Sequence, residues 1–106
     1  MTGGVYNNGE LAGYLSKSPE GQFRFCYDQS YFHDVSKPAI SLTLPKTQQE
    51  YTSDHLFAFF QGLLAEGVNK DIQCRTLKID EQDDFTRLLR TAGEDTIGAI
   101  TIKPID

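Results

Sequence analysis

A long apolar stretch, from Ser53 to Gly67, limits the possible folds of this chain more than any other part of its sequence. At about 100° per residue, its large hydrophobic side chains fall within one arc of roughly 160°. These side chains are Leu56, Phe57, Phe59, Phe60, Leu63 and Leu64. An arc this wide predicts a helix that is seated on a hydrophobic core. Ser53 or Asp54 can cap the start of the helix, and Gly67 can take the left-handed conformation that ends it.

The opposite face of the same stretch carries small residues where a surface helix usually carries charge. Ala58, Gly62 and Ala65 follow one another at helical spacing, so a second surface can approach the helix closely there. Two interpretations are open. Either the sheet or another helix of the domain covers this face, or a partner protein does.

Size and charge exclude several classes of protein. With 106 residues, we expect one domain, spanning 1–106, that can bury a core without disulfides or metal. Fifteen acidic residues against ten basic ones give a net charge of −5, and no run of Lys or Arg offers a footprint for phosphates. The sequence has neither an apolar run of membrane-spanning length nor a basic-then-apolar leader, so we expect a cytoplasmic protein. Cys26 and Cys74 are expected to be reduced structural thiols.

The first part of the chain predicts a meander of antiparallel strands. Asn8-Gly9 is the strongest short hairpin signal in the sequence, and a second turn follows at 18–21. Aromatic residues then alternate along 23–27, as in a half-buried strand. Residues 28–37 are expected to form an ordered loop, in which one short helical turn is an alternative. A further strand is predicted over 38–45, which alternates and is bounded by prolines, with 46–52 as a connection.

Two more helices and a last strand are predicted after the apolar stretch. A helical pattern restarts at Val68 and extends to about Leu77. The next helix can be capped by Asp80 and ends at Gly93, and a strand follows over 98–103. The buried stripe of that helix consists of Phe85, Leu88, Leu89 and Ala92. The predicted class is therefore α+β: a small antiparallel β-sheet of about five strands, open or partly closed, packed with about three α-helices.

No pattern in the sequence indicates a catalytic, cofactor or metal site. His33 and His55 are the only imidazoles, and neither belongs to a cluster with metal-ligand spacing. The acidic residues at 80–84 lack the glycine and terminal Glu of a calcium loop, so we expect them to begin a helix. The same carboxylates argue against a helix-turn-helix that reads DNA. We expect a binding protein rather than an enzyme; the alternative is an unrecognised site at His33, His55 or Asp95.

Six short motifs, taken in chain order, carry a resemblance to a known family. They are Val5 with Asn8-Gly9, Gly13 and Leu15; Phe25-x-Tyr27; Pro38-x-x-Ser41-x-x-Leu44-Pro45; Phe60-x-x-Leu63-Leu64-x-Glu66-Gly67; Asp84-Phe85-x-x-Leu88-Leu89; and Gly93-x-Asp95-x-x-Gly98-Ala99. In this order and at these spacings they resemble the amino-terminal domain of HipA-type toxin kinases, over nearly the whole chain. In a full-length HipA, the resemblance implies, a kinase body would follow this domain.

The chain also resembles HipS, the small antitoxin of three-component HipBST toxin–antitoxin systems. This resemblance implies a non-enzymatic antitoxin that docks on a HipT-like serine/threonine kinase toxin and inhibits it. A HipB-like DNA-binding protein would belong to the same complex, and the chain itself would contact neither nucleic acid nor membrane. The alternative is a non-inhibitory structural or assembly domain of a HipA-like kinase.

One segment departs from the family pattern. Family members often have Leu-Leu-Pro-Glu-Gly-Trp where this chain has Leu63-Leu64-Ala65-Glu66-Gly67-Val68, and the chain contains no Trp. An inhibitor without that aromatic residue could act from the same corner through polar side chains, or it could hold the kinase in an inactive arrangement. The predicted kinase interface consists of Glu66, Gly67, Val68, Asn69, Lys70 and Asp71, together with the small residues Ala58, Gly62 and Ala65.

Overall fold

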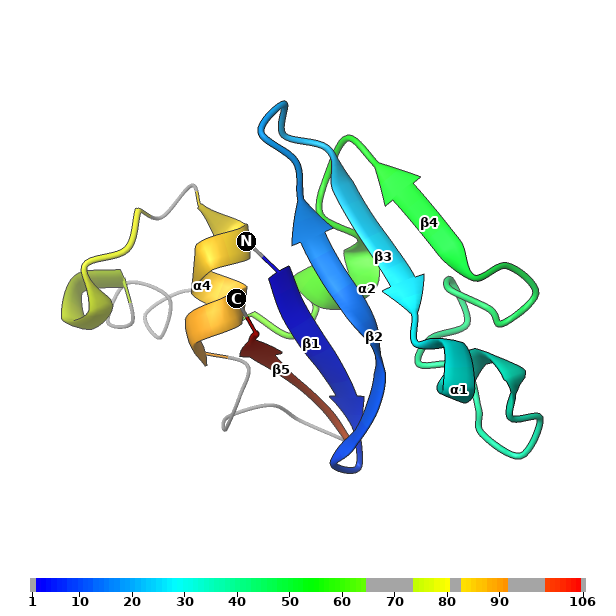
Figure 1. The fold of residues 1–106 in the computed structure, drawn as a ribbon. Helices are drawn as coiled ribbons and strands as arrows, with labels where there is room; N and C mark the ends of the chain where they lie inside the picture. The colour runs from blue at the N-terminus through cyan, green and yellow to red at the C-terminus, as the bar shows by residue number, and fades with distance from the viewer. Residues whose placement is uncertain (1, 65–73, 81–82, 92–98, 106) are drawn as a thin grey trace.

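A five-stranded antiparallel sheet forms the centre of the fold, as the computed structural model shows for residues 2–64, 74–80, 83–91 and 99–105 (Figure 1). The strand order is β4-β3-β2-β1-β5, so the sheet is open and the partly closed alternative is wrong. The elements are β1 (Thr2–Asn7), β2 (Glu10–Lys17), β3 (Phe23–Tyr27), α1 (Gln29–His33), β4 (Glu50–Ser53), α2 (Ala58–Gln61), α4 (Asp84–Thr91) and β5 (Ile100–Pro104). Residues 74–77 are also helical. The predicted α+β class is confirmed.

The predicted meander is confirmed as β1, β2 and β3, joined by the two expected turns. Asn8 and Gly9 have φ angles of 53° and 83°, the left-handed conformation that a tight hairpin turn between two strands requires. At the second turn the Gly21 amide donates to the Ser18 carbonyl at 2.9 Å, as in a β-turn over 18–21. These turns set a register in which Gly13 lies beside Val5 on β1 and Tyr27 on β3.

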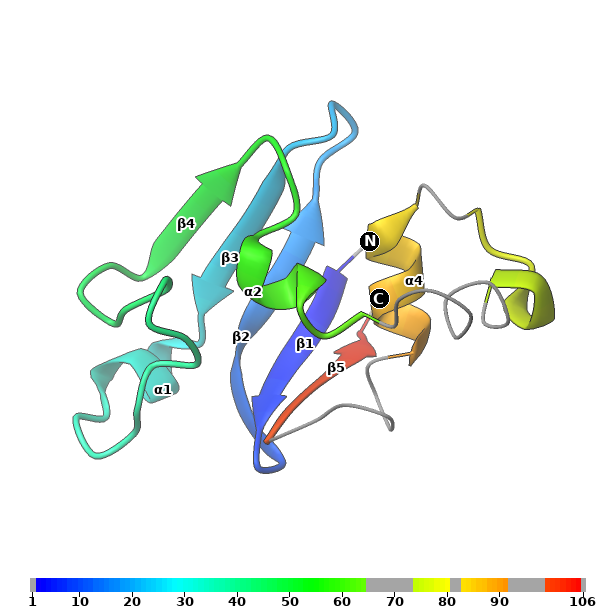
Figure 2. The same ribbon diagram turned by 180° about the vertical axis from the view of Figure 1, so that it is seen from behind.

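One face of the sheet carries the hydrophobic core, and α2 lies over it in Figure 2. Phe60 of α2 is fully buried and its ring centroid lies 5.7 Å from that of Phe25 on β3. At the other side of this face, Phe85 of α4 meets Phe23 edge to face at 5.8 Å. The helices therefore cover a continuous layer of aromatic and aliphatic side chains contributed by all the inner strands.

The opposite face of the sheet is polar and half exposed, and no labelled helix covers it in Figure 1. Arg24 and Glu50 form an ion pair across β3 and β4 at 2.5 Å, with about half of each side chain in solvent (54% and 47%). Tyr6 and Tyr14 are half-buried on the same face. This division into one apolar and one polar face is usual for antiparallel sheets and explains the alternation in the sequence.

The predicted helix over 53–67 is much shorter in the structure, so its expected start is wrong. Ser53 pairs with Phe23 as the last residue of β4, and Phe57 has extended backbone angles (φ −55°, ψ 140°). The helix therefore cannot begin before Ala58. Its hydrophobic side nevertheless faces the core as predicted, because Phe60 is buried together with Leu56 and Leu64. Residues 65–67 lie outside the described part of the chain.

The predicted strand over 38–45 is also wrong. The place beside β3 is taken by β4, whose first three residues lie in the segment expected to be a connection. A strand would put Ile40, Leu42 and Leu44 on one face, whereas Leu42 is exposed between two buried residues. In 28–37, expected to be a loop, the short-helix alternative is correct: α1 forms after Asp28, whose carboxylate accepts the Tyr31 amide at 3.3 Å.

The C-terminal elements follow the prediction more closely. Helix α4 has Phe85, Leu88 and Leu89 on its buried side, but its cap is Asp83 rather than Asp80. The Asp83 carboxylate accepts both the amide (3.1 Å) and the hydroxyl (2.7 Å) of Thr86. β5 then pairs with β1 as the last strand. Helical structure at 74–77 agrees with the end of the predicted 68–77 helix, whose first residues lie outside the described part.

Candidate protein-binding surfaces

The sequence-predicted interface is only partly described by the structure. Ala58 and Gly62 are both exposed and lie one turn apart, as the first residue and the C-cap of α2, where the Gly62 amide donates to the Ala58 carbonyl at 3.1 Å. A Cβ atom at Gly62 would meet only backbone oxygens of its own turn, at 3.4 and 3.7 Å. The described part of the domain therefore leaves these two positions open. Outside the described residues lie Ala65, Glu66, Gly67, Val68, Asn69, Lys70 and Asp71, and their role stays a prediction.

A second surface, which sequence reasoning missed, is the tethered loop, defined here as residues 34–49. β3 and β4 are antiparallel neighbours, and such strands are commonly joined by two to five residues. Here α1 and the tethered loop intervene. Figure 1 shows them at the end of the sheet away from the turn between β2 and β3. The connection is thus far longer than the geometry of the strands requires.

Three tyrosine hydroxyls fix the backbone of the tethered loop. Tyr27 of β3 donates to the Leu44 carbonyl and accepts the Ile40 amide at 3.2 Å. Tyr31 of α1 donates to the Pro38 carbonyl at 2.7 Å, and Tyr51 of β4 donates to the Pro45 carbonyl at 2.6 Å. The three tyrosines belong to β3, α1 and β4. Their hydroxyls therefore supply the hydrogen-bond partners that a neighbouring strand would supply in a sheet. Burial at this position raises the pKa of Tyr27.

Contacts of Lys46, Lys37 and Asp34 stabilise the tethered loop internally. The Lys46 ammonium donates to the carbonyls of Asp34 (2.7 Å) and Lys37 (2.9 Å), which joins the end of the loop to its beginning. Lys37 pairs with Glu10 and, at 3.7 Å, with Asp34. The Asp34 carboxylate also accepts the hydroxyl (2.6 Å) and the amide (3.0 Å) of Ser36, which lowers the pKa of Asp34. The charged groups of the loop are therefore matched within the domain.

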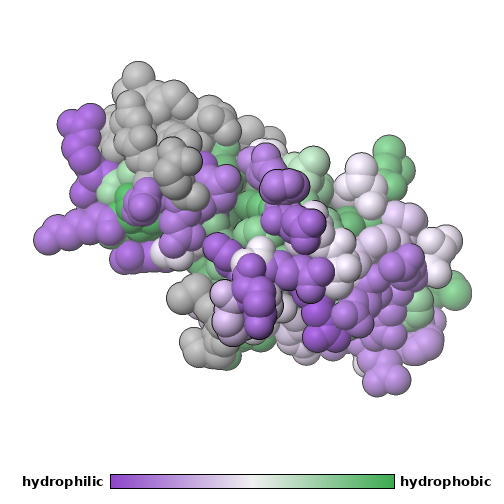
Figure 3. All heavy atoms as spheres, turned by 90° about the horizontal axis from the view of Figure 1, so that it is seen from above, coloured by the Kyte–Doolittle hydropathy of each residue, from purple (hydrophilic) through white to green (hydrophobic). Residues whose placement is uncertain are grey.

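The apolar residues of the loop divide between the core and solvent. Ile40 and Leu44 are buried, whereas Val35 and Leu42 are 100% and 99% exposed. Figure 3 shows hydrophobic side chains projecting among polar ones at the end of the molecule that holds this loop. Isolated exposed apolar residues are common on protein surfaces. Binding residues, for their part, are often found on loops that a rigid scaffold holds in place.

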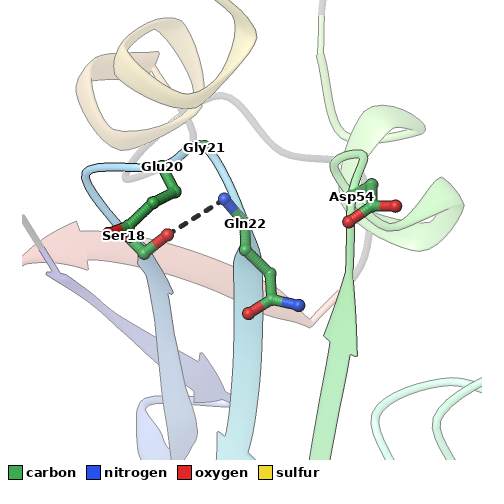
Figure 4. Close-up of a pocket in the computed structure, with 5 residues that line it drawn as sticks. All are labelled: Ser18, Glu20, Gly21, Gln22 and Asp54. Carbon is green, nitrogen blue, oxygen red and sulfur yellow. Dashed lines mark hydrogen bonds between the residues drawn. The ribbon is translucent and has the colours of Figure 1, made fainter.

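Shallow hollows lie at the opposite end of the sheet, and two of them are lined by Asp54. One, of about 540 Å³, is lined by the turn between β2 and β3 and by Asp54 (Figure 4). In it the Ser18 hydroxyl accepts the Gln22 amide at 3.1 Å, so this hydroxyl is engaged in the turn. The neighbouring hollow, of about 320 Å³, includes Asp54, His55 and Asp84. The first is lined by two carboxylates, Glu20 and Asp54, whereas the second has Lys17 beside its two carboxylates.

The residues named as catalytic alternatives do not converge in the described structure. His33 and His55 are both exposed. The ring centroid of His33 lies 5.3 Å from that of Phe32, and the backbone amide of His55 donates to the Ser53 hydroxyl. Asp95 lies outside the described residues. Within those residues, no group of three His, Cys, Asp or Glu side chains could hold a metal ion, and no helix could span a membrane. Cys26 and Cys74 are not joined in a disulfide.

Comparison with known proteins identifies relatives of two sizes. The putative kinase Y4mE of Sinorhizobium fredii is 28% identical over 102 residues, which are 96% of this chain but only 24% of the kinase. The chain thus spans about a quarter of that relative. An uncharacterized protein of Haemophilus influenzae is 35% identical over 102 residues, and here the match covers 91% of the relative.

Structural comparison points to the same group. The N-terminal domain of HipA toxin superposes with a TM-score of 0.70 at 32% identity, over 99% of this chain and 94% of that one. The sequence model of the HipA N-terminal domain matches residues 4–103. These matches agree with the six motifs found in the sequence. The chain belongs to the HipA N-terminal domain family of toxin–antitoxin proteins.

Proposed function

We propose that this protein is a HipS-like antitoxin that binds and inhibits a HipT- or HipA-like serine/threonine kinase toxin. It acts as a single domain over residues 1–106, in the cytoplasm and without a cofactor or an enzymatic activity of its own. A HipB-like DNA-binding protein belongs to the same complex. The antitoxin itself contacts neither nucleic acid nor membrane, in keeping with its net charge of −5.

The contrast between the two relatives carries this proposal. The same domain is a quarter of a putative kinase in one relative and 91% of the other. Interfaces between domains of one chain resemble interfaces between separate proteins. A surface that faces the kinase body within one chain is therefore suited to bind a separate kinase.

We place the kinase at the corner 66–71 and the adjoining back face of Ala58, Gly62 and Ala65. Support comes from α2, where the two described small residues are exposed and no described element covers them. Because Val68 stands where the family often has Trp, inhibition relies on the polar side chains Glu66, Asn69 and Lys70, or on an inactive arrangement of the kinase.

A charge exchange tests this placement. Glu66→Lys combined with Lys70→Glu keeps the net charge of the chain. It should weaken kinase binding about tenfold, because charges at the edge of an interface determine how well the electrostatic potentials of the two proteins match. The matched control exchanges the Arg24–Glu50 pair on the open sheet face, as Arg24→Glu with Glu50→Arg. If the first exchange leaves the affinity unchanged in a calorimetric titration, the corner is not the docking site.

A second candidate function is a structural or assembly domain that does not inhibit. The kinase relative favours it, because there the domain lies within the same chain as the rest of the protein. Expression of the chain with its genomic neighbours, followed by a pull-down and a kinase assay, separates the two functions. Capture of a kinase whose phosphorylation falls as the chain is added supports inhibition. Capture without inhibition supports assembly, and failure to capture any kinase contradicts both.

A further inference from the structure

We infer that the tethered loop is a second docking element for the partner kinase, and that the exposed Leu42 of this loop enters an apolar hollow on that kinase. This inference rests on the proposed function and adds to the corner 66–71 a separate, uncharged contact. It follows from the position of the loop, its fixation, its exposed side chains and its charge.

The position of the loop comes first. A hairpin turn would suffice to join β3 to β4, yet the chain makes an excursion through α1 and residues 34–49. Long ordered connections without regular structure are uncommon in small domains and are mostly functional. Only part of this connection serves the core, through Tyr31 of α1 and through Ile40 and Leu44.

The fixation of the loop comes second. Hydroxyl groups of Tyr27, Tyr31 and Tyr51 hold it from three elements, and Lys46 ties its end to its beginning. A loop that is ordered before binding loses less conformational entropy when a partner binds it. Such a loop is suited to present a side chain in a defined direction, as recognition loops on rigid scaffolds do.

The exposed side chains come third. Leu42 lies between buried Ile40 and buried Leu44, so the same contacts that anchor its neighbours hold it in solvent. An aliphatic side chain that is 99% exposed has nearly all of its surface available to a partner. Such a residue contributes to binding when a pocket on the partner removes it from water.

The charges of the tethered loop indicate which kind of kinase surface it contacts. Lys37 is paired with Glu10 and Asp34, and Lys46 is bound to backbone carbonyls. The loop therefore offers few unmatched charges within a protein of net charge −5. The complementary surface should be apolar and uncharged, unlike the partner of the Glu66 and Lys70 corner, and its contribution should depend little on salt.

Leu42→Ser tests the inference, and the probe is a purified kinase that the unmodified chain captures from among its genomic neighbours. We expect this variant to bind the kinase roughly tenfold more weakly, at low salt and at 0.5 M salt alike, because apolar burial is lost. Ile105→Ser is the matched control, since Ile105 is another exposed apolar residue, 46% in solvent and beyond β5. It should bind like the unmodified chain. Circular dichroism should be the same for all three proteins.

The outcomes separate the two proposals. If the unmodified chain binds the kinase and Leu42→Ser binds equally well, the loop inference is wrong while the proposed function stands. If the unmodified chain does not bind, both fail. If sedimentation shows that Leu42 instead joins two copies of this chain, because Leu42→Ser dissociates a dimer and leaves kinase binding unchanged, the inference is also wrong.

Discussion

The meander of β1, β2 and β3 and the tethered loop are both ordered, but different groups hold them. Backbone pairing holds the meander, from Thr2 with Ser16 to Lys17 with Phe23, with one register shift between Val5 and Tyr6. The loop depends instead on side chains that reach its backbone, above all the hydroxyl of Tyr27. Order in the meander is thus spread over many equivalent bonds, whereas order in the loop rests on a few atoms that single substitutions can remove.

The largest effect should come from the core beneath the meander. Phe25→Ala removes a fully buried ring that contacts Tyr27 at 4.9 Å and Phe60 at 5.7 Å. We expect it to lower the free energy of unfolding by about 3–5 kcal/mol, measured by urea denaturation. Arg24→Ala, on the neighbouring exposed position, should cost less than about 1 kcal/mol. Similar losses for both variants would contradict the assignment of the two faces.

A methyl group in the middle of the meander should have the next largest effect. A Cβ at Gly13 would lie 2.6 Å from the Cys26 carbonyl oxygen and 2.8 Å from the Phe25 ring. Gly13→Ala should therefore destabilise the domain by about 1–3 kcal/mol, seen as a lower midpoint of thermal unfolding. Gly62→Ala is the control, because its Cβ has room, and should leave stability the same or slightly higher. A neutral Gly13→Ala would show that strands β2 and β3 are not packed as described.

Loss of one hydroxyl should loosen the loop and leave the meander intact. Tyr27→Phe keeps the ring in the core but removes the partner of the Leu44 carbonyl and the Ile40 amide. We expect a loss of about 1–2 kcal/mol, with faster hydrogen exchange and proteolysis confined to 34–49. Unchanged exchange in the loop, or equal acceleration in β1 and β2, would contradict the contrast between the two regions.

Alkaline pH should act on the same hydroxyl in a smaller and graded way. Burial raises the pKa of Tyr27 above its ordinary value of 10.0, so the folded state holds this proton more tightly than the unfolded state. Its contribution to stability is complete below pH 10 and is lost as pH rises above that value. Tyr27→Phe should therefore show a weaker fall in thermal stability above pH 10. An identical pH profile would show that this hydroxyl does not titrate with unfolding.

The contrast also explains which parts of the fold the sequence could predict. Alternation, Asn8-Gly9 and the helical stripe of α4 are local signals, and they correctly predicted the meander and the last helix and strand. Residues 38–45 alternate as well, but tertiary contacts of Tyr27 with Ile40 and Leu44 override that pattern. Likewise, Ser53 is drawn into β4 by pairing with Phe23, which no helical periodicity can indicate.

The two candidate surfaces also differ in whether they could be found from the sequence. The small residues Ala58 and Gly62 could be found from helical spacing, and the structure leaves both exposed. The tethered loop could not be found, because its exposed and buried apolar residues have the same spacing as a strand. Only the positions of the tyrosine hydroxyls distinguish Leu42 from its neighbours. The family could be identified because its motifs extend along nearly the whole chain.

The most direct test of the account is a titration, with this chain, of a purified kinase that the chain captures from among its genomic neighbours, in which phosphate transfer to a protein substrate is measured. Complex formation is followed in the same samples by size-exclusion chromatography. We predict that phosphate transfer falls in step with the fraction of kinase in the complex, and that Leu42→Ser shifts both curves together to higher concentration. Full kinase activity in a sample where all of the kinase is bound would contradict the proposed antitoxin function.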